Sequence, residues 1–232
     1  LYDLTELQRD ANKIWGYSAK QTLSIMQRLY ENYKILTYPR TDSRYITTDI
    51  VATIPDRLKA IAIGEYRATA DALLKTKING HKGFVDNSKV SDHHAIIPTE
   101  QKPNLALLSS EERKIYDLVV KRFLSVMLPP FEYVQTTIEA NVEGERLIAK
   151  GKVVKSKGWK KLYDHLEEDN CEDDIKEQVL PKVNKGDKVS LTKVELKTGQ
   201  TKAPARFTEA TLLSAMENPH KYIKVGKEAA KT

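Results

Sequence analysis

A tyrosine and an arginine two positions apart are the residues of this sequence from which phosphate chemistry could be built. Tyr38 and Arg40 stand in the stretch Ile-Leu-Thr-Tyr-Pro-Arg-Thr-Asp-Ser, residues 35–43. A phenol is mostly protonated at neutral pH, so it attacks an electrophile only beside a base or a positive charge. Arginine stays charged, and its planar fork fits two oxygens of a phosphodiester. One interpretation is therefore a nucleophile beside a phosphate clamp.

A second interpretation of the same stretch is purely structural. Lys34–Tyr38 has the character of a short strand, and Pro39 would end it because proline has no N–H for a ladder. Thr41, Asp42 and Ser43 can then fix a turn through bonds from their side chains to the backbone. The residues of this stretch alone permit both interpretations and do not select one.

The histidines and the single cysteine offer little for a metal site. His93 and His94 are adjacent, so on a strand or a helix they would point in different directions and would not readily chelate one ion. One of them can bond a phosphate or a backbone group, or can simply cap a short strand. Cys171 is the only cysteine, which excludes an internal disulfide and a thiolate cluster and makes a reducing, cytoplasmic setting the expectation.

The composition is that of a globular protein with a basic bias. The chain has 232 residues, 40% of them hydrophobic, and its 38 Lys+Arg against 32 Asp+Glu give a net charge of +6. This bias is a modest argument for a polyanionic partner. No apolar run approaches the roughly 18 residues of a membrane span, and no signal peptide opens the chain, so we expect no membrane partner. Because the sequence does not begin with methionine, we expect a fragment of a longer protein.

Helical periodicity runs through about the first 127 residues. We expect one helix that starts near Leu4, with Asp3 or Thr5 as its cap, and that ends at Gly16. Ser18 can cap the next helix, and the pair resembles a helix-turn-helix, a motif that is also common in plain helical domains. Two further helices are expected over these ranges: Thr48–Ala70, bent or restarted near Pro55, and Ser110–Met127.

Beyond residue 130 the pattern changes to the period of a half-buried strand. Val134–Val142 alternates apolar with polar residues, and Leu147–Val154 follows a turn as the returning strand. Lys188–Leu196 is expected to add another strand, and the acidic residues 164–178 are expected to form a loop.

The helical pattern resumes near the end of the chain, where Thr208 can cap a helix that runs to about Met216. The sequence therefore predicts a multidomain α+β fold with three parts. Residues 1–129 form a helical, helix-turn-helix-like (winged-helix or CAP-like) domain that carries Tyr38. Residues 130–203 form a small antiparallel β domain, and residues 204–232 are the truncated start of a third, DNA-binding helical domain.

Four motifs in order connect this sequence with a known family. Thr-Tyr-Pro-Arg-Thr-Asp-Ser-Arg-Tyr, residues 37–45, resembles the active-site signature of type IA DNA topoisomerases. Asp-His-His-Ala-Ile-Ile-Pro-Thr, residues 92–99, resembles the histidine motif in the form seen in topoisomerase III. Residues 158–163 and 204–219 are similar to two later family segments, and residues 5–8 and 27–31 to the helices before the tyrosine. The bacterial topoisomerase III branch fits best.

The resemblance implies an enzyme that transiently breaks and rejoins one DNA strand, without ATP, for relaxation or decatenation. It makes Tyr38 the nucleophile that forms a 5′-phosphotyrosyl bond, Arg40 the residue that positions the tyrosine and the scissile phosphate, and His93 the histidine that bonds the phosphate near the break. His94 falls where other branches carry a carboxylate. It further implies DNA contacts by the following residues: Arg206, Thr208, Gln8 and Arg28.

The resemblance also implies parts that this sequence lacks. The family binds Mg²⁺ through a glutamate and an Asp-x-Asp pair of an acidic domain, and no Asp-x-Asp occurs here. We therefore expect no metal ligands in this chain and no efficient DNA cleavage by the chain alone. Single-stranded DNA is the implied partner, and a helicase and a single-strand-binding protein are the expected companions at the nucleoid.

A different class of function competes with this expectation. The helix-turn-helix and the basic surface would also suit a non-catalytic DNA-binding module in which Tyr38 is structural. Such a module would prefer duplex DNA, would be sequence-selective and would be indifferent to Tyr38→Phe. The topoisomerase interpretation instead predicts preference for single strands and a strong dependence on salt.

Overall fold

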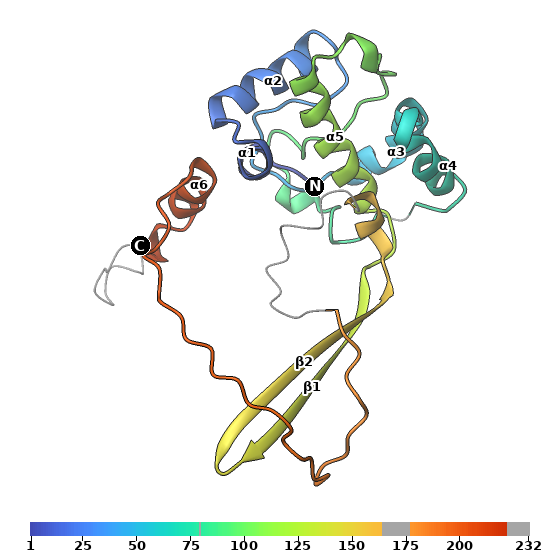
Figure 1. The fold of residues 1–232 in the computed structure, drawn as a ribbon. Helices are drawn as coiled ribbons and strands as arrows, with labels where there is room; N and C mark the ends of the chain where they lie inside the picture. The colour runs from blue at the N-terminus through green and yellow to red at the C-terminus, as the bar shows by residue number, and fades with distance from the viewer. Residues whose placement is uncertain (79, 164–176, 222–232) are drawn as a thin grey trace. The chain divides into compact units, whose positions relative to one another are not determined.

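The computed structural model describes residues 1–78, 80–163 and 177–221. It divides into two compact units, one made of Leu1–Leu128 with the residues from Arg206 onward, and one made of Pro129–Ala205. The division into three domains expected from the sequence stays a prediction. Figure 1 labels the helices and strands, whose bounds are α1 Leu4–Trp15, α2 Ala19–Glu31, α3 Thr48–Ile61, α4 Arg67–Leu74, α5 Ser110–Ser125, α6 Glu209–Glu217, β1 Glu132–Val142 and β2 Glu145–Ser156.

Helices α1, α2 and α5 form the main core of the first unit. Asp3 accepts a hydrogen bond from the Glu6 amide and caps α1, and Gly16 ends that helix in the left-handed conformation (φ 70°). Ser18 caps α2 through the Gln21 amide. The apolar faces of the three helices are buried against one another through residues that include Leu7, Ala11, Ile25, Met26, Leu29, Ile115, Val119 and Phe123.

The expectation of one long helix over residues 48–70 is wrong, because two helices form there. Helix α3 keeps Pro55 within it but stops at Ile61, and the chain then forms the short 3₁₀ turn Gly64–Tyr66 before α4. Gly64 has a φ of 49°, a left-handed conformation that an α-helix cannot contain. The break therefore lies between Ile61 and Gly64 and not at Pro55.

The helix-turn-helix pair is present as α1 and α2, but a winged-helix or CAP-like architecture is not confirmed. In the described part of the first unit the β structure consists of isolated bridges, such as those between Tyr2 and Ile96 and between Ile46 and Val85. None of the described helices has the length and hydropathy of a membrane span.

The second unit is built on the antiparallel hairpin β1–β2, in which Val134 lies opposite Val153. Glu143 and Gly144 have positive φ angles of 50° and 90°, as in the type I′ turns that match the twist of such hairpins. Gly158 is also left-handed, and a Cβ there would lie 2.1 Å from the Pro130 carbonyl oxygen. Only glycine therefore fits where the chain leaves the hairpin.

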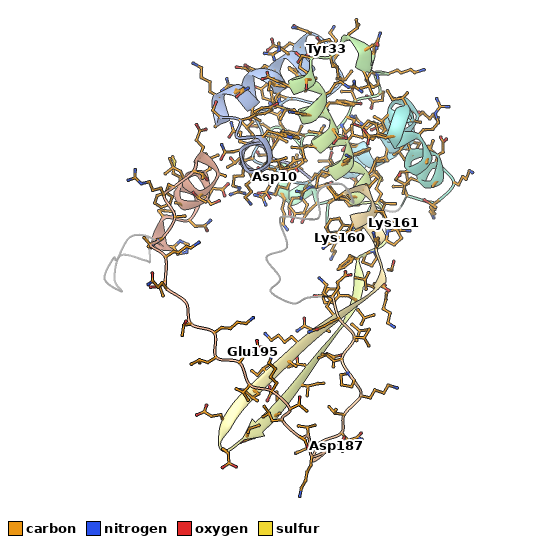
Figure 2. All side chains as sticks on the ribbon, viewed as in Figure 1. Asp10, Tyr33, Lys160, Lys161, Asp187 and Glu195 are labelled. Atoms are coloured by element: carbon orange, nitrogen blue, oxygen red, sulfur yellow. The ribbon has the colours of Figure 1, made fainter. Side chains whose placement is uncertain are left out.

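The third strand expected over residues 188–196 does not form. This segment has no helix or strand, and its apolar residues are exposed, Val189 by 69% and Leu196 by 91%. Its alternating pattern lacks a neighbouring strand to pair with. Figure 2 shows side chains such as Asp187 and Glu195 along this part of the chain. Most of the acidic stretch 164–178 and the last residues of 204–232 lie outside the described residues.

A buried carboxylate joins α2 to α5. Glu112 is 4% exposed, accepts a hydrogen bond from Arg28 Nε at 2.7 Å, and completes a capping box with Ser109 at the start of α5. Burial opposes its ionisation, but the hydrogen bonds from Arg28 and Ser109 outweigh that effect and lower the pKa of Glu112. Tyr33, just beyond α2, also donates to this carboxylate.

Replacing Glu112 by glutamine should lower the free energy of unfolding by about 2 kcal/mol at pH 7, because a charged hydrogen-bonded pair is broken in a buried place. Since the folded state lowers the pKa of Glu112, its contribution is present above the unfolded value near ~4.3 and is lost as the pH falls below it. Urea unfolding at pH 7 and pH 4 should show the difference between the variant and the parent shrinking with acid. Glu111→Gln, at an exposed neighbour, is the control, and equal losses for both variants would contradict the assignment.

Candidate active site

Two segments far apart in the sequence lie side by side at the candidate site. Leu36 and Pro98 form an isolated antiparallel bridge, and Thr37 N–H donates to the Ile97 carbonyl at 3.0 Å. The strand expected over residues 34–38 is therefore wrong, because the pairing stays a single bridge, with prolines at 39 and 98 that have no N–H to extend it. The pairing nevertheless brings the tyrosine segment against the histidine segment.

Buried hydroxyl groups fix the turn after the tyrosine, as the sequence indicated for Thr41 and Ser43. Thr41 Oγ1 donates to the His93 carbonyl at 2.9 Å and accepts from the Ser43 amide at 3.1 Å. Ser43 Oγ donates to the Lys89 carbonyl at 2.8 Å. Both hydroxyl residues are buried, so these bonds are shielded from water and hold the turn to the histidine segment.

The Tyr38 ring contacts two other rings. Its centroid is 4.4 Å from that of His93, with the planes tilted by 39°, and 5.5 Å from that of Tyr30 in an edge-to-face arrangement. Tyr38 also lines two cavities, one of about 580 Å³ with Tyr30 and Lys34 and one of about 350 Å³ with Asp49. The phenol is half-buried, so the structure supports its ring from the sides and leaves it approachable.

The two histidines have different surroundings. His93 is exposed and stacks on Tyr38. His94 is half-buried, and its Nδ1 lies 2.7 Å from the Ala95 carbonyl oxygen, which places the proton on Nδ1. Burial lowers the pKa of His94, although the bond to Ala95 acts in the opposite direction. His94 lines both cavities beside Tyr38 and is therefore part of the candidate site. Its position next to His93 in the sequence did not indicate this placement.

The remaining predicted site residues contact neither Tyr38 nor His93 through any hydrogen bond, ion pair or ring contact in the described part of the chain. Arg40 is exposed. Gln8 is buried and donates to the Ala19 carbonyl at 3.0 Å, and Arg28 is paired with Glu112. Arg206 is exposed.

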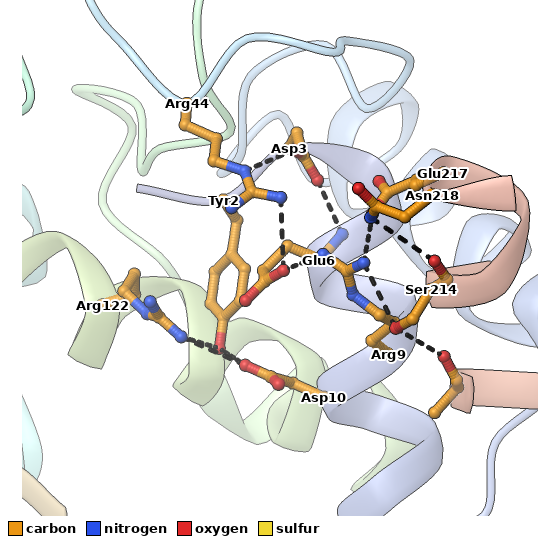
Figure 3. Close-up of polar contacts among 11 residues, drawn as sticks. Tyr2, Asp3, Glu6, Arg9, Asp10, Arg44, Arg122, Ser214, Glu217 and Asn218 are labelled. Atoms are coloured by element: carbon orange, nitrogen blue, oxygen red, sulfur yellow. Dashed lines mark hydrogen bonds and ion pairs between the residues drawn. The ribbon is translucent and has the colours of Figure 1, made fainter. Parts of the chain in front are cut away.

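Thr208 caps α6: its hydroxyl accepts from the Thr211 amide, and its own amide donates to Thr211 Oγ1, which completes a capping box. Helix α6 lies against α1 through polar contacts, drawn in part in Figure 3. Arg9 is ion-paired with both Glu6 and Glu217, and the Ala210 amide donates to Asn12 Oδ1 at 3.0 Å.

Arg44, near the end of the signature stretch, is paired with residues at the start of the same helix. Its Nε donates to Asp3 Oδ2 at 2.6 Å, and it is also paired with Glu6 at 3.3 Å (Figure 3). Helix α1 therefore connects the segment that follows Tyr38 with the helix that follows Arg206.

The described residues do not fit a magnesium site. They contain no group of three or more His, Cys, Asp or Glu side chains that could hold a metal ion, whereas Mg²⁺ needs oxygen ligands in near-octahedral geometry. The acidic side chains of α1 are instead paired with arginines. The Mg²⁺ implied by the family resemblance has no set of ligands here.

Comparison with known proteins identifies the family. A family model described as DNA topoisomerase matches residues 1–231, so the chain belongs to the DNA topoisomerase family, in its type IA class. The chain is 61% identical over 224 residues to DNA topoisomerase 3 of Bacillus thuringiensis (strain Al Hakam), covering 96% of this chain and 31% of that protein. It is 53% identical over 223 residues to DNA topoisomerase 3 of Bacillus subtilis (strain 168), with the same two coverages. The resemblance to the topoisomerase III branch is confirmed.

A solved structure shares the fold. Full-length topoisomerase I from Thermotoga maritima aligns with a TM-score of 0.56 and 21% identity, over 93% of this chain and 34% of that one. A mixed arrangement of helices with a small two-stranded antiparallel sheet is thus confirmed as the fold class. The chain spans about a third of the length of the curated relatives it matches.

Replacing Thr41 by valine should loosen the site without changing its shape. The variant loses the bond to the His93 carbonyl and leaves the Ser43 amide without its acceptor, so we expect the free energy of unfolding to fall by about 2 kcal/mol. Amide hydrogen exchange should speed up at Ser43 in particular. Thr136→Val, on an exposed position of β1, is the matched control, and unchanged exchange at Ser43 would show that the hydroxyl does not hold the turn.

Proposed function

We propose that this chain is the tyrosine-bearing part of a type IA DNA topoisomerase that breaks and rejoins one strand of DNA. The observation that carries the proposal is the placement of Tyr38, half-buried against His93 and open to two cavities, within a chain of this family. The phenol oxygen attacks a phosphodiester of single-stranded DNA. An O–P bond to Tyr38 forms, the P–O3′ bond breaks, the phenol loses its proton and the 3′ oxygen takes one up.

The reverse step restores the strand. The 3′-hydroxyl attacks the 5′-phosphotyrosyl bond, and Tyr38 leaves as the phenol. Because the new ester keeps the energy of the old one, rejoining needs no ATP, as the family resemblance implies. Strand passage between the two steps would give relaxation or decatenation in the whole protein.

Arg40 and His93 complete the proposed reaction centre. Arg40 is exposed and has no ion pair or hydrogen bond in the described residues, so its guanidinium is available to hold two oxygens of the scissile phosphate and to offset charge in the transition state. His93 presents an exposed ring beside the phenol and can bond the same or the next phosphate. Both roles follow the family pattern.

The DNA contacts proposed outside the centre differ in their support. Arg206 is exposed just before α6, where the amide groups of a helix start also favour an anion, and Thr208 lies at that start. Gln8 and Arg28 are engaged within the fold, so their contact with DNA would require those bonds to be exchanged. They stay predictions with less support than Arg206.

In the whole protein, Mg²⁺ would be held by residues outside this chain and would favour strand cleavage. A helicase and a single-strand-binding protein are proposed companions, since the reaction needs a single-stranded segment. The non-catalytic helix-turn-helix module remains the alternative, and the experiment below separates the two.

Tyr38→Phe in the whole protein should abolish the covalent adduct. The test uses Mg²⁺ and a single-stranded oligonucleotide labelled on the 3′ side of the break, because a 5′-phosphotyrosyl bond retains that side. Denaturing gels should show label on the parent protein and at least about a hundredfold less on the variant, since phenylalanine has no attacking oxygen. Tyr17→Phe, at the turn between α1 and α2, is the control. An adduct on Tyr38→Phe, or none on the parent, would favour the structural interpretation.

The chain of 232 residues alone should bind the same oligonucleotide but yield no more than about a hundredth of the adduct of the whole protein. The expected reason is that its described residues provide no magnesium ligands. Robust Mg²⁺-dependent cleavage by the chain alone would contradict this expectation.

A further inference from the structure

The larger cavity beside Tyr38 is lined by residues to which the proposed reaction gives no role. Its volume of about 580 Å³ lies within the range of small-molecule sites. Besides Tyr38 it is lined by Tyr30 and Glu31 from the end of α2, by Lys34, and by Thr99 from the histidine segment. An aromatic ring, a cation and a carboxylate thus border one space next to the phenol.

Lys34 is held in a conformation that its own side chain disfavours. Its φ is 57°, in the left-handed region where glycine or asparagine is usual after a helix. The backbone around it is fixed, because the Ile35 amide donates to the Leu29 carbonyl at 3.1 Å and Thr99 Oγ1 donates to the Lys34 carbonyl at 2.6 Å. Neither bond involves the side chain of Lys34, so glycine would satisfy the turn better.

The side chain of Lys34 has no evident structural task. It is exposed, and no ion pair or hydrogen bond of its ammonium group occurs among the described residues. A residue that strains the backbone and serves no contact in the fold is most readily explained by a ligand. The cavity that it borders is where such a ligand would lie.

Tyr30 provides the second element of a single-strand site. Its ring stands edge-on to Tyr38 at 5.5 Å and is 38% exposed, although a tyrosine of a helix stripe would normally be covered. Proteins that bind single-stranded nucleic acid combine aromatic rings for the bases with cations for the backbone. Glu31 would repel a phosphate at its end of the cavity but can accept from an exocyclic amino group of a base.

We propose that this cavity binds one nucleotide of single-stranded DNA next to the phosphate that Tyr38 attacks, with its phosphate at Lys34 and its base against Tyr30. The inference rests on the proposed function, since it concerns the same strand. Lys34 and Tyr30 are binding residues that position the strand, and they take no part in the bond changes. A duplex would not fit, because the base must leave its stack to meet Tyr30.

Lys34→Gln in the whole protein should weaken binding of a single-stranded oligonucleotide about five- to tenfold. Because one phosphate contact is lost, the slope of log K against log salt should fall in magnitude by about 0.7. Lys34→Arg should keep both the affinity and the slope. Fluorescence anisotropy with Tyr38→Phe as the background measures binding without cleavage, and an unchanged affinity and slope for Lys34→Gln would overturn the proposal.

Lys34→Gly separates the ligand role from a structural one. Glycine relieves the left-handed strain, so the thermal midpoint of unfolding should stay equal or rise, while DNA binding should weaken as in Lys34→Gln. A structural lysine would instead give a lower midpoint, and that result would overturn the proposal.

Tyr30→Leu should weaken binding about tenfold and Tyr30→Phe should not, since the ring and not the hydroxyl meets the base. Equal affinities for Tyr30→Leu and the parent would overturn the role of the ring. Adduct formation by the parent protein, with Tyr38 intact, tests the proposed function separately from these binding measurements. If the parent protein formed no adduct, the proposed function would be refuted. If Lys34→Gln and Tyr30→Leu bound the oligonucleotide as well as the parent does, only the proposal that the cavity binds a nucleotide would be refuted.

Discussion

The pairing of Thr37 with Ile97 is the constraint on which the candidate site depends. The Thr37 amide donates to the Ile97 carbonyl at 3.0 Å, and the Ile97 amide donates to Thr37 Oγ1 at 2.9 Å. Thr37 thus meets the opposite backbone with both its main chain and its side chain. The same pairing of segments places the Tyr38 ring against the His93 ring, and the bond from Thr41 to the His93 carbonyl supports it.

The sequence predicted local structure well where local signals decide it. The caps Asp3, Ser18 and Thr208 and the terminator Gly16 all act as expected, because a cap satisfies backbone groups only a few residues away. The break at Gly64 was missed, since a single glycine inside a periodic apolar pattern is often tolerated.

Non-local structure was predicted less well. The strand expected over 188–196 had the right alternation, but alternation does not provide a partner strand, and apolar residues such as Leu196 stay exposed. Motifs predicted a candidate site of Tyr38, Arg40 and His93, and the structure brings Tyr38 and His93 into contact. The role of Arg40 stays a prediction. The contacts of Gln8 and Arg28 within the fold could not be read from motifs, since they depend on which helices pack together.

The docking of α6 on α1 has a consequence for the way this unit opens. Ala210 is the one fully buried residue of α6, and the contact with α1 includes ion pairs and hydrogen bonds such as those of Arg9 and Asn12. Such contacts are individually weak in water and are screened by salt, whereas the core of α1, α2 and α5 is apolar. Helix α6 should therefore detach and return as a local event at low free-energy cost, while the helices that carry the tyrosine segment stay folded.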